Sequence, residues 1–103
     1  MASYEVEVDR ALRKEIRNLP GQVRQRVIRA LQDLRQKPRP PESRPLETVK
    51  ADIKLASGTE LRRIRIESWR IVYLVEDEAR LVSVLAVRKR PPYQYEDLDE
   101  LLP

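Results

Sequence analysis

The stretch LRRIRIESWRIVYLVEDEARLVSVLAV, residues 61–87, decides the fold. In 61–66, Ile64 and Ile66 fall on one face of a strand and Arg63 and Arg65 on the other. In 69–75, a period of two sets Trp69, Ile71, Tyr73 and Val75 against Arg70, Val72 and Leu74, and 80–87 is rich in Val and Leu. Such runs of β-branched and aromatic residues predict strands. Only the two-residue connection Glu67-Ser68 and the polar turn 76–79 separate them, and connections this short join antiparallel neighbours. We therefore expect a three-strand antiparallel meander whose last strand is central.

Upstream residues predict one further strand and two helices. Tyr4 to Val8 alternates apolar and acidic residues, which predicts a half-buried strand, and Asp9 is a suitable N-cap for a helix after it. The dipeptide Pro20-Gly21 ends this helix. A second amphipathic helix is expected from about Gln22 to Arg35, and two helices joined by two residues form an antiparallel hairpin.

The order of these elements predicts an α+β fold. The hairpin must bury its apolar stripe, and one sheet face is the available partner. We expect an N-terminal strand, an α-helical hairpin and the meander, with the helices on one face of a mainly antiparallel four-stranded sheet. The proline-rich segment Lys37 to Pro45 is interpreted as an extended surface linker. Residues 1–95 are expected to form one domain, and 96–103 a short acidic C-terminal tail.

The composition excludes several kinds of chemistry. The 103 residues include neither Cys nor His, so thiol nucleophiles, imidazole catalysis, Cys/His zinc sites and disulfides are impossible. No apolar run approaches the roughly 20 residues of a membrane span. The N-terminus lacks the pattern of a signal peptide. We expect a cytoplasmic protein without membrane association, cofactor or metal.

The net charge of +4 conceals a more basic body. Four of the 17 acidic residues lie in the last eight positions, so residues 1–95 carry 21 basic and 13 acidic groups, a net charge of +8. Sixteen of the basic residues are Arg, whose planar guanidinium suits bidentate binding of phosphate or carboxylate. Charge alone leaves a nucleic acid, an acidic partner and a merely soluble surface open.

Residue parity predicts where these arginines gather. If the strands pair side by side, five of them can converge on the sheet face opposite the helices, and an anion such as phosphate would compensate their repulsion. They are Arg63, Arg65, Arg70, Arg88 and Arg90. Lys89 lies between the last two. The alternative is that each arginine pairs with a nearby carboxylate, for instance Glu60, Glu67 or Glu76.

Aromatic residues lie beside these arginines in sequence. Tyr93 and Tyr95 follow Arg90, and Trp69 precedes Arg70. Bases of single-stranded RNA stack on such rings. The two tyrosines either serve this role or tether the tail to the sheet, whereas the parity of Trp69 favours core packing.

Three segments of the sequence, together with the first strand, resemble a known family. The segments RRIRIESWRIVYLV (62–75), LVSVLAVRKRPPY (81–93) and LPGQVRQRVIRALQDLRQKPRPP (19–41), with the first strand, are similar to the RelE/ParE superfamily of toxins from bacterial type II toxin–antitoxin systems. The resemblance extends over about residues 3–95. It implies a helical hairpin on a mainly antiparallel sheet.

Similarity to the RelE branch of this superfamily implies a function for the protein. Its members are mRNA interferases, metal-independent endoribonucleases that cut mRNA in the ribosomal A site, inhibit translation, and form hetero-oligomers with a neutralising cognate antitoxin. The resemblance implies RNA-binding roles for Arg63, Arg65, Arg88 and Lys89, and catalytic roles for Arg70, Arg65, Arg90 and one of Tyr93 and Tyr95.

Two departures from the family pattern affect the mechanism. Arg65 stands where some members have a Lys that acts as general base, and an always-protonated Arg is a poor base. Either a Tyr with a lowered pKa is then the base, or catalysis is largely electrostatic, or activity is weak. Glu67-Ser68 replaces a Gly-containing turn, and Glu67 is either a turn residue or a rival base. A ParE-like DNA gyrase inhibitor and a non-catalytic module that binds RNA or an acidic partner remain as alternatives.

Overall fold

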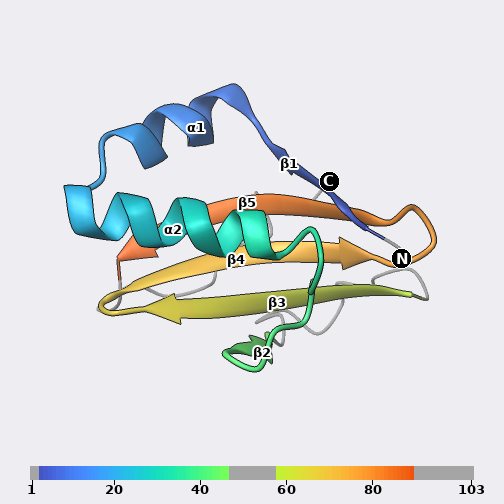
Figure 1. Cartoon of the computed structure of the whole chain (residues 1–103). Helices are drawn as coiled ribbons and strands as arrows, with labels where there is room; N and C mark the ends of the chain where they lie inside the picture. Colours follow the sequence, from blue (N-terminus) through green and yellow to red (C-terminus); the bar gives the residue numbers. More distant parts are fainter. Residues whose placement is uncertain (1–2, 47–57, 90–103) are drawn as a thin grey trace, which may run out of the picture.

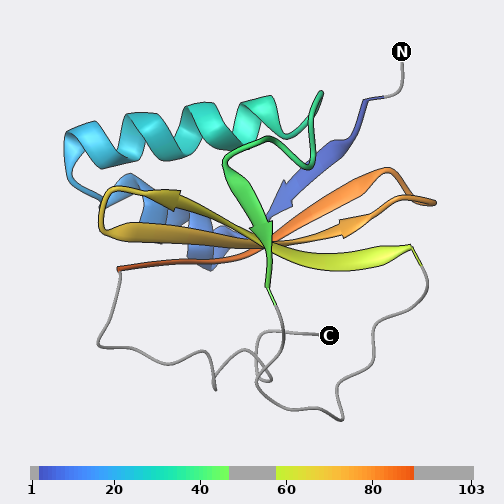
Figure 2. The same cartoon turned by 90° about the horizontal axis from the view of Figure 1, so that it is seen from below.

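The computed structural model describes residues 3–46 and 58–89. Two helices pack on one face of a five-stranded sheet. Figure 2 shows the second helix, in cyan, lying over that face. The α+β class and the order of the predicted elements are confirmed. The elements are β1 (Glu5–Val8), α1 (Arg10–Arg17), α2 (Gly21–Asp33), β2 (Ser43–Pro45), β3 (Thr59–Ile66), β4 (Trp69–Glu76) and β5 (Leu81–Lys89) (Figure 1).

The strand order is β1-β5-β4-β3-β2. The predicted meander is present, since β3, β4 and β5 pair antiparallel in succession. The first strand pairs parallel with β5, and the helical hairpin and the three other strands lie between them in the chain. The prediction of four strands was wrong, because β2 adds a fifth strand at the edge beside β3.

This fifth strand lies in the segment predicted to be a surface linker. Ser43 pairs with Ile64 and Arg44 with Arg63, so the end of the segment joins the sheet. Its sequence, Ser-Arg-Pro, has no alternation of apolar residues that would indicate a strand. Pro45 is tolerated because an edge strand need not donate every backbone hydrogen bond.

The two helices begin close to the residues that the sequence marks. Asp9 caps α1, since its carboxylate accepts a 2.7 Å hydrogen bond from the backbone N–H of Leu12. In α2 the first helical hydrogen bond runs from the N–H of Arg24 to the carbonyl of Pro20, at 2.8 Å. The second helix ends at Asp33, slightly before the predicted end at Arg35.

The main core lies between the helices and the sheet. The helices contribute Leu12, Ile16, Val23, Val27 and Leu31, and the sheet contributes buried side chains that include Ile64, Ile71, Tyr73, Val75, Val82, Val84 and Val87. Trp69 packs partly buried against this core, as predicted from its parity. Each such aliphatic side chain contributes about 1.5–3 kcal/mol relative to remaining exposed.

The opposite sheet face has a second apolar cluster. Leu61, Val72, Leu74 and Ala86 are buried there, at relative exposures of 1–4%, with Leu85 packed against them. The middle of this face is therefore buried. The exposed part is the end where Arg65 and Arg88 lie.

The β3–β4 turn forms at Glu67-Ser68, because Ile66 pairs directly with Trp69. Glu67 has a φ of 51°, the left-handed region in which Gly fits without steric cost. Its exposed carboxylate lies 3.2 Å from the guanidinium of Arg26 on α2. We therefore interpret Glu67 as a turn residue that also joins the β3–β4 turn to α2.

Candidate functional site

Three arginines lie side by side across the meander. In the register of the sheet Arg65 on β3 is directly opposite Arg70 on β4, and Arg70 is directly opposite Arg88 on β5. We call these three residues the arginine row. Directly opposite residues have Cβ atoms about 5 Å apart and point to the same face. Since Arg70 has the parity of Val72 and Leu74, that face is the one without helices.

A second pair of arginines adjoins the row. Arg63 lies two residues before Arg65 on β3, and Arg44 on β2 is its direct partner. The sequence interpretation missed Arg44 because it did not predict β2. The guanidinium of Arg44 donates hydrogen bonds to the carbonyls of Pro41 and Ser43, at 2.8 and 2.9 Å. With the row, these two residues form the arginine cluster.

The cluster concentrates positive charge on one end of a rigid sheet. Like charges directly opposite one another destabilise a pair of strands, and an anion in contact with several guanidiniums relieves that repulsion. Two of the carboxylates considered as local partners bind arginines outside the cluster. Glu60 binds Arg39 and Arg62, and Glu67 binds Arg26. This arrangement can bind phosphate groups in a bidentate manner.

Other predicted site residues lie elsewhere or outside the described residues. Lys89 is opposite Trp69, and Trp69 packs against the helix-side core, so Lys89 has the parity of the helix face. Arg90, Tyr93 and Tyr95 lie outside the described residues, as does the acidic tail 96–103. The structure therefore brings Arg63, Arg65, Arg70 and Arg88 together but separates Lys89 from them.

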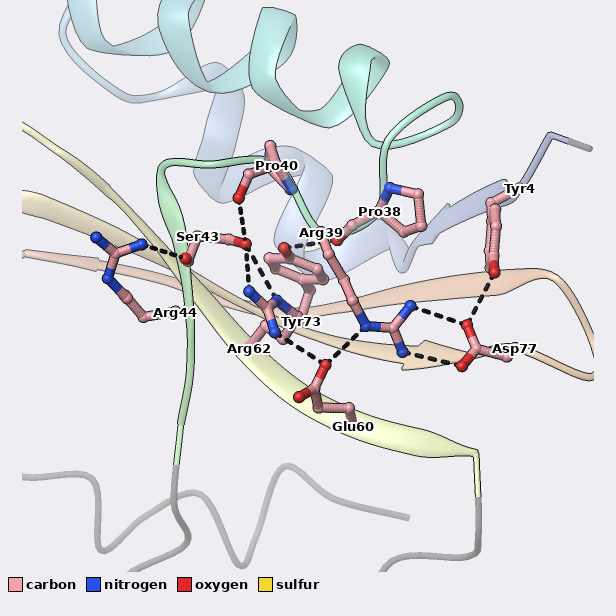
Figure 3. Close-up of polar contacts among 10 residues, drawn as sticks. All are labelled: Tyr4, Pro38, Arg39, Pro40, Ser43, Arg44, Glu60, Arg62, Tyr73 and Asp77. Carbon is pink, nitrogen blue, oxygen red and sulfur yellow. Dashed lines mark hydrogen bonds and ion pairs between the residues drawn. The ribbon is translucent and has the colours of Figure 1, made fainter.

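A second polar cluster lies near the opposite end of β3 (Figure 3). The guanidinium of Arg62 is buried and donates to the hydroxyl of Ser43 from Nε and Nη2, at 3.0 and 2.8 Å. Its Nη1 lies 2.9 Å from Glu60, which also accepts a 2.9 Å hydrogen bond from Arg39. Because Ser43 belongs to β2 and Arg39 precedes it, these bonds hold the segment after α2 against the sheet.

Two tyrosine hydroxyls complete this polar cluster. Tyr73 donates to the carbonyl of Pro38 and Tyr4 to the carboxylate of Asp77, both at 2.8 Å. Burial raises the pKa of Tyr73, and the hydrogen bond to Asp77 raises that of Tyr4. Neither phenol therefore suits a general base near neutral pH. We interpret this cluster as structural.

Within residues 3–46 and 58–89, no group of three acidic side chains is arranged to hold a metal ion. The helices of the same residues are too short and too polar to cross a bilayer.

Comparisons with known proteins identify relatives of this fold. The family described as ParE toxin of type II toxin–antitoxin system, parDE, matches residues 3–91. A chain of the archaeal RelE–RelB complex from Pyrococcus horikoshii OT3 is 22% identical with a TM-score of 0.73, covering 87% of this chain and 98% of that one. For the RelBE2 toxin–antitoxin complex from Mycobacterium tuberculosis the identity is 26%, the TM-score 0.63 and the coverages 85% and 99%.

The isolated E. coli RelE toxin is also similar. It is 23% identical with a TM-score of 0.62, and the match covers 97% of this chain and 100% of that one. No curated protein matches.

Proposed function

Because the chain belongs to the ParE toxin family of type II toxin–antitoxin systems, we propose that this toxin inhibits translation by cutting mRNA on the ribosome. It would act as a metal-independent endoribonuclease in the cytoplasm, and a cognate antitoxin would neutralise it in a hetero-oligomer. The similarity to the RelBE2 toxin–antitoxin complex, at 26% identity, supports the antitoxin partner.

The arginine row is the observation that carries this proposal. Arg65, Arg70 and Arg88 occupy directly paired positions on three strands, so the sheet fixes their spacing before any substrate binds. Preorganised donors lower a barrier because they need no rearrangement as charge develops in the transition state. A phosphodiester under attack gains negative charge on its oxygens, and guanidiniums stabilise that charge.

The proposed reaction needs no external reactant. The 2′-oxygen of a ribose forms a bond to the adjacent phosphorus, and the bond from phosphorus to the 5′-oxygen breaks. The 2′-hydroxyl proton goes to a base and the 5′-oxygen receives a proton, which leaves a 2′,3′-cyclic phosphate and a 5′-hydroxyl. Arg70 and Arg65 would stabilise the phosphorane-like transition state, and Arg63 and Arg88 would hold the flanking RNA backbone.

The proton acceptor is proposed among the C-terminal tyrosines. Tyr4 and Tyr73 have raised pKa values and their hydroxyls donate to Asp77 and Pro38. An arginine is too basic to accept a proton near neutral pH. Tyr93 and Tyr95 are the remaining candidates, and Arg90 is proposed to act with them on the leaving oxygen.

The family match favours a second candidate function. Its description names ParE rather than RelE, and the ParE branch of the superfamily poisons DNA gyrase without nuclease chemistry. Under this alternative the arginine cluster would bind an acidic surface instead of a scissile phosphate.

One experiment separates the two functions. Purified toxin is added to ribosomes programmed with a defined mRNA, and 5′ ends are mapped by primer extension. We expect cleavage that requires ribosomes and falls at least about a hundredfold in Arg70→Ala, the scale of losing one transition-state donor. Arg29→Ala removes an exposed arginine of α2 and should cleave normally.

The same preparations are then tested for inhibition of gyrase supercoiling. Intact mRNA together with inhibited gyrase would overturn the proposal in favour of the alternative. Circular dichroism and thermal unfolding establish that each variant is folded.

A further inference from the structure

The arginine cluster has two levels on the helix-free face of the sheet. The first level is the arginine row. At the second level, two residues earlier on β3, Arg63 is opposite Arg44 of β2 on one side and Val72 of β4 on the other. Val72 is buried in the apolar cluster. The arginine cluster is therefore L-shaped, with three guanidiniums across the sheet and two at its β2 edge.

The two levels are separated by two residues of β3. A strand rises about 3.3 Å per residue, so the Cα atoms of Arg63 and Arg65 lie about 6.6 Å apart. An extended single strand of RNA spaces its successive phosphates on the same scale. One RNA strand can therefore place one phosphate on the arginine row and its neighbour between Arg44 and Arg63.

Arg44 is exposed, but its guanidinium is held along its own strand. Its Nη1 donates to the carbonyls of Pro41 and Ser43, at 2.8 and 2.9 Å. Both bonds start from one nitrogen, and a guanidinium has five N–H donors on three nitrogens. A donor that is held in place before binding loses less conformational entropy when an anion arrives. Arg44 is thus prepared for a phosphate contact.

Arg44 lies at this edge because a buried contact fixes β2. The hydroxyl of the buried Ser43 accepts hydrogen bonds from Nε and Nη2 of Arg62, at 3.0 and 2.8 Å. The same hydroxyl donates to the carbonyl of Pro40 at 2.7 Å. Figure 3 shows these bonds on one side of β2 and the guanidinium of Arg44 on the other. Loss of the Arg62–Ser43 contact would therefore release the strand that carries Arg44.

We propose that Arg44 and Arg63 form a second phosphate subsite, which binds the RNA phosphate next to the scissile one, and that Ser43 is a positioning residue that holds Arg44 in it. The inference rests on the proposed function, because the arginine row must hold the scissile phosphate. It adds a residue of β2 to the RNA contacts. It also gives the buried Arg62–Ser43 contact a role beyond stability.

The first test measures the subsite in single turnovers. Ribosomes that carry a short synthetic mRNA are mixed with excess toxin, and the cleavage rate is measured against toxin concentration. Arg44→Ala should raise the half-saturating concentration about tenfold, the scale of a hydrogen bond to a charged group. The maximal rate should change little, because the contact exists both before and during the reaction. Arg29→Ala removes the same charge from α2 and should leave both values unchanged.

The neighbouring phosphate is then neutralised. A methylphosphonate replaces the phosphate on one side of the mapped cleavage site, and in a second mRNA it replaces the phosphate on the other side. In one of these mRNAs the wild type and Arg44→Ala should become equal, because the contact is already lost. A difference that persists in both mRNAs would overturn the subsite.

The positioning role of Ser43 is tested in the same assay. Ser43→Ala removes the acceptor for Arg62, so it should raise the half-saturating concentration on unmodified mRNA but not on the mRNA with the critical methylphosphonate. Arg44→Ala added to Ser43→Ala should cause little further loss. Ser43→Thr keeps the hydroxyl and should retain most of the wild-type affinity. If Ser43→Ala does not fold, Ser43→Cys replaces it, because sulfur is a weaker acceptor. An equal loss on both mRNAs would contradict the positioning role.

Failure of this inference is distinguishable from failure of the proposed function. If the wild type cuts no mRNA on the ribosome, both proposals fail. If the wild type cuts mRNA and Arg44→Ala has the same half-saturating concentration, only the second subsite fails.

Discussion

The guanidinium of Arg39 binds both carboxylate oxygens of Asp77, with Nη1–Oδ1 and Nη2–Oδ2 distances of 3.0 Å each. This ion pair joins the segment after α2 to the β4–β5 turn. The Nε of the same guanidinium donates to Glu60 on β3. Three separate parts of the chain therefore meet at one arginine, far in sequence from the arginine row.

The two carboxylates of this site predict how stability depends on pH. The hydrogen bond from Arg39 lowers the pKa of Asp77. At Glu60, burial alone would raise the carboxyl pKa. Hydrogen bonds and charges from Arg39 and Arg62 outweigh burial, so the pKa of Glu60 is lowered as well. Their stabilisation is therefore present above the ordinary carboxyl pKa of about 4 and is lost as the pH falls through the lower folded values.

The measurement is thermal unfolding of the wild type and of Glu60→Gln/Asp77→Asn at pH 7 and at about pH 3. The variant should melt lower at pH 7, and the difference should shrink in acid because the wild-type carboxylates are then protonated. Glu78→Gln, an exposed change beside Asp77, is the control and should match the wild type at both pH values. An undiminished difference in acid would contradict the ion-pair interpretation.

Removing one buried hydroxyl should cost a measurable amount of stability. Tyr73 is fully buried and its hydroxyl donates to the carbonyl of Pro38 at 2.8 Å. Tyr73→Phe should lower the free energy of unfolding by about 1 kcal/mol, the net value of such a bond. Urea denaturation measures it. Tyr4 is only partly buried, so Tyr4→Phe should cost less. An equal or larger loss there would count against burial as the cause.

The cap of α1 gives a third prediction. Asp9→Ala removes the acceptor of the Leu12 N–H, so unfolding should become easier by about 0.5–2 kcal/mol. Asp9→Ser keeps a capping oxygen and should lose little. If both variants lost the same amount in urea denaturation, the side-chain cap would not be what stabilises this helix end.

Relieving the crowded charges should stabilise the fold while harming its proposed activity. Arg65 is exposed and directly opposite Arg70. Arg65→Gln should raise the free energy of unfolding by about 0.2–1 kcal/mol at low salt, and added salt should erase the gain. Urea denaturation at two ionic strengths tests this. A destabilised variant, or a gain that grows with salt, would show that like-charge repulsion is not the governing effect.

Local patterns were enough to predict the parts of the fold that depend on neighbouring residues. The alternation in β3 and β4, the cap at Asp9 and the two-residue turn at Glu67-Ser68 are all local signals. The common face of Arg63 and Arg65 follows from the same period of two. Their convergence with Arg70 required only that successive strands pair.

The remaining features depend on contacts between distant residues. Ser43–Pro45 becomes a strand because Arg62 binds Ser43 and the edge of β3 is available, and neither cause is visible in three residues. The register shift in β5 is equally silent: Val84 pairs with Tyr73 and Ala86 with Val72, which leaves Leu85 as an extra residue, and Leu simply continues the apolar run.

The parallel pairing of β1 with β5 affects how the chain folds during its synthesis. Glu5 pairs with Leu81 and Val8 with Val84. The ribosome therefore adds more than seventy residues after the first strand before its partner strand exists. Pairings this distant in sequence form late and slowly, because the intervening chain must close a long loop first. The sheet that holds the arginine row is thus completed only after β5 has been synthesised.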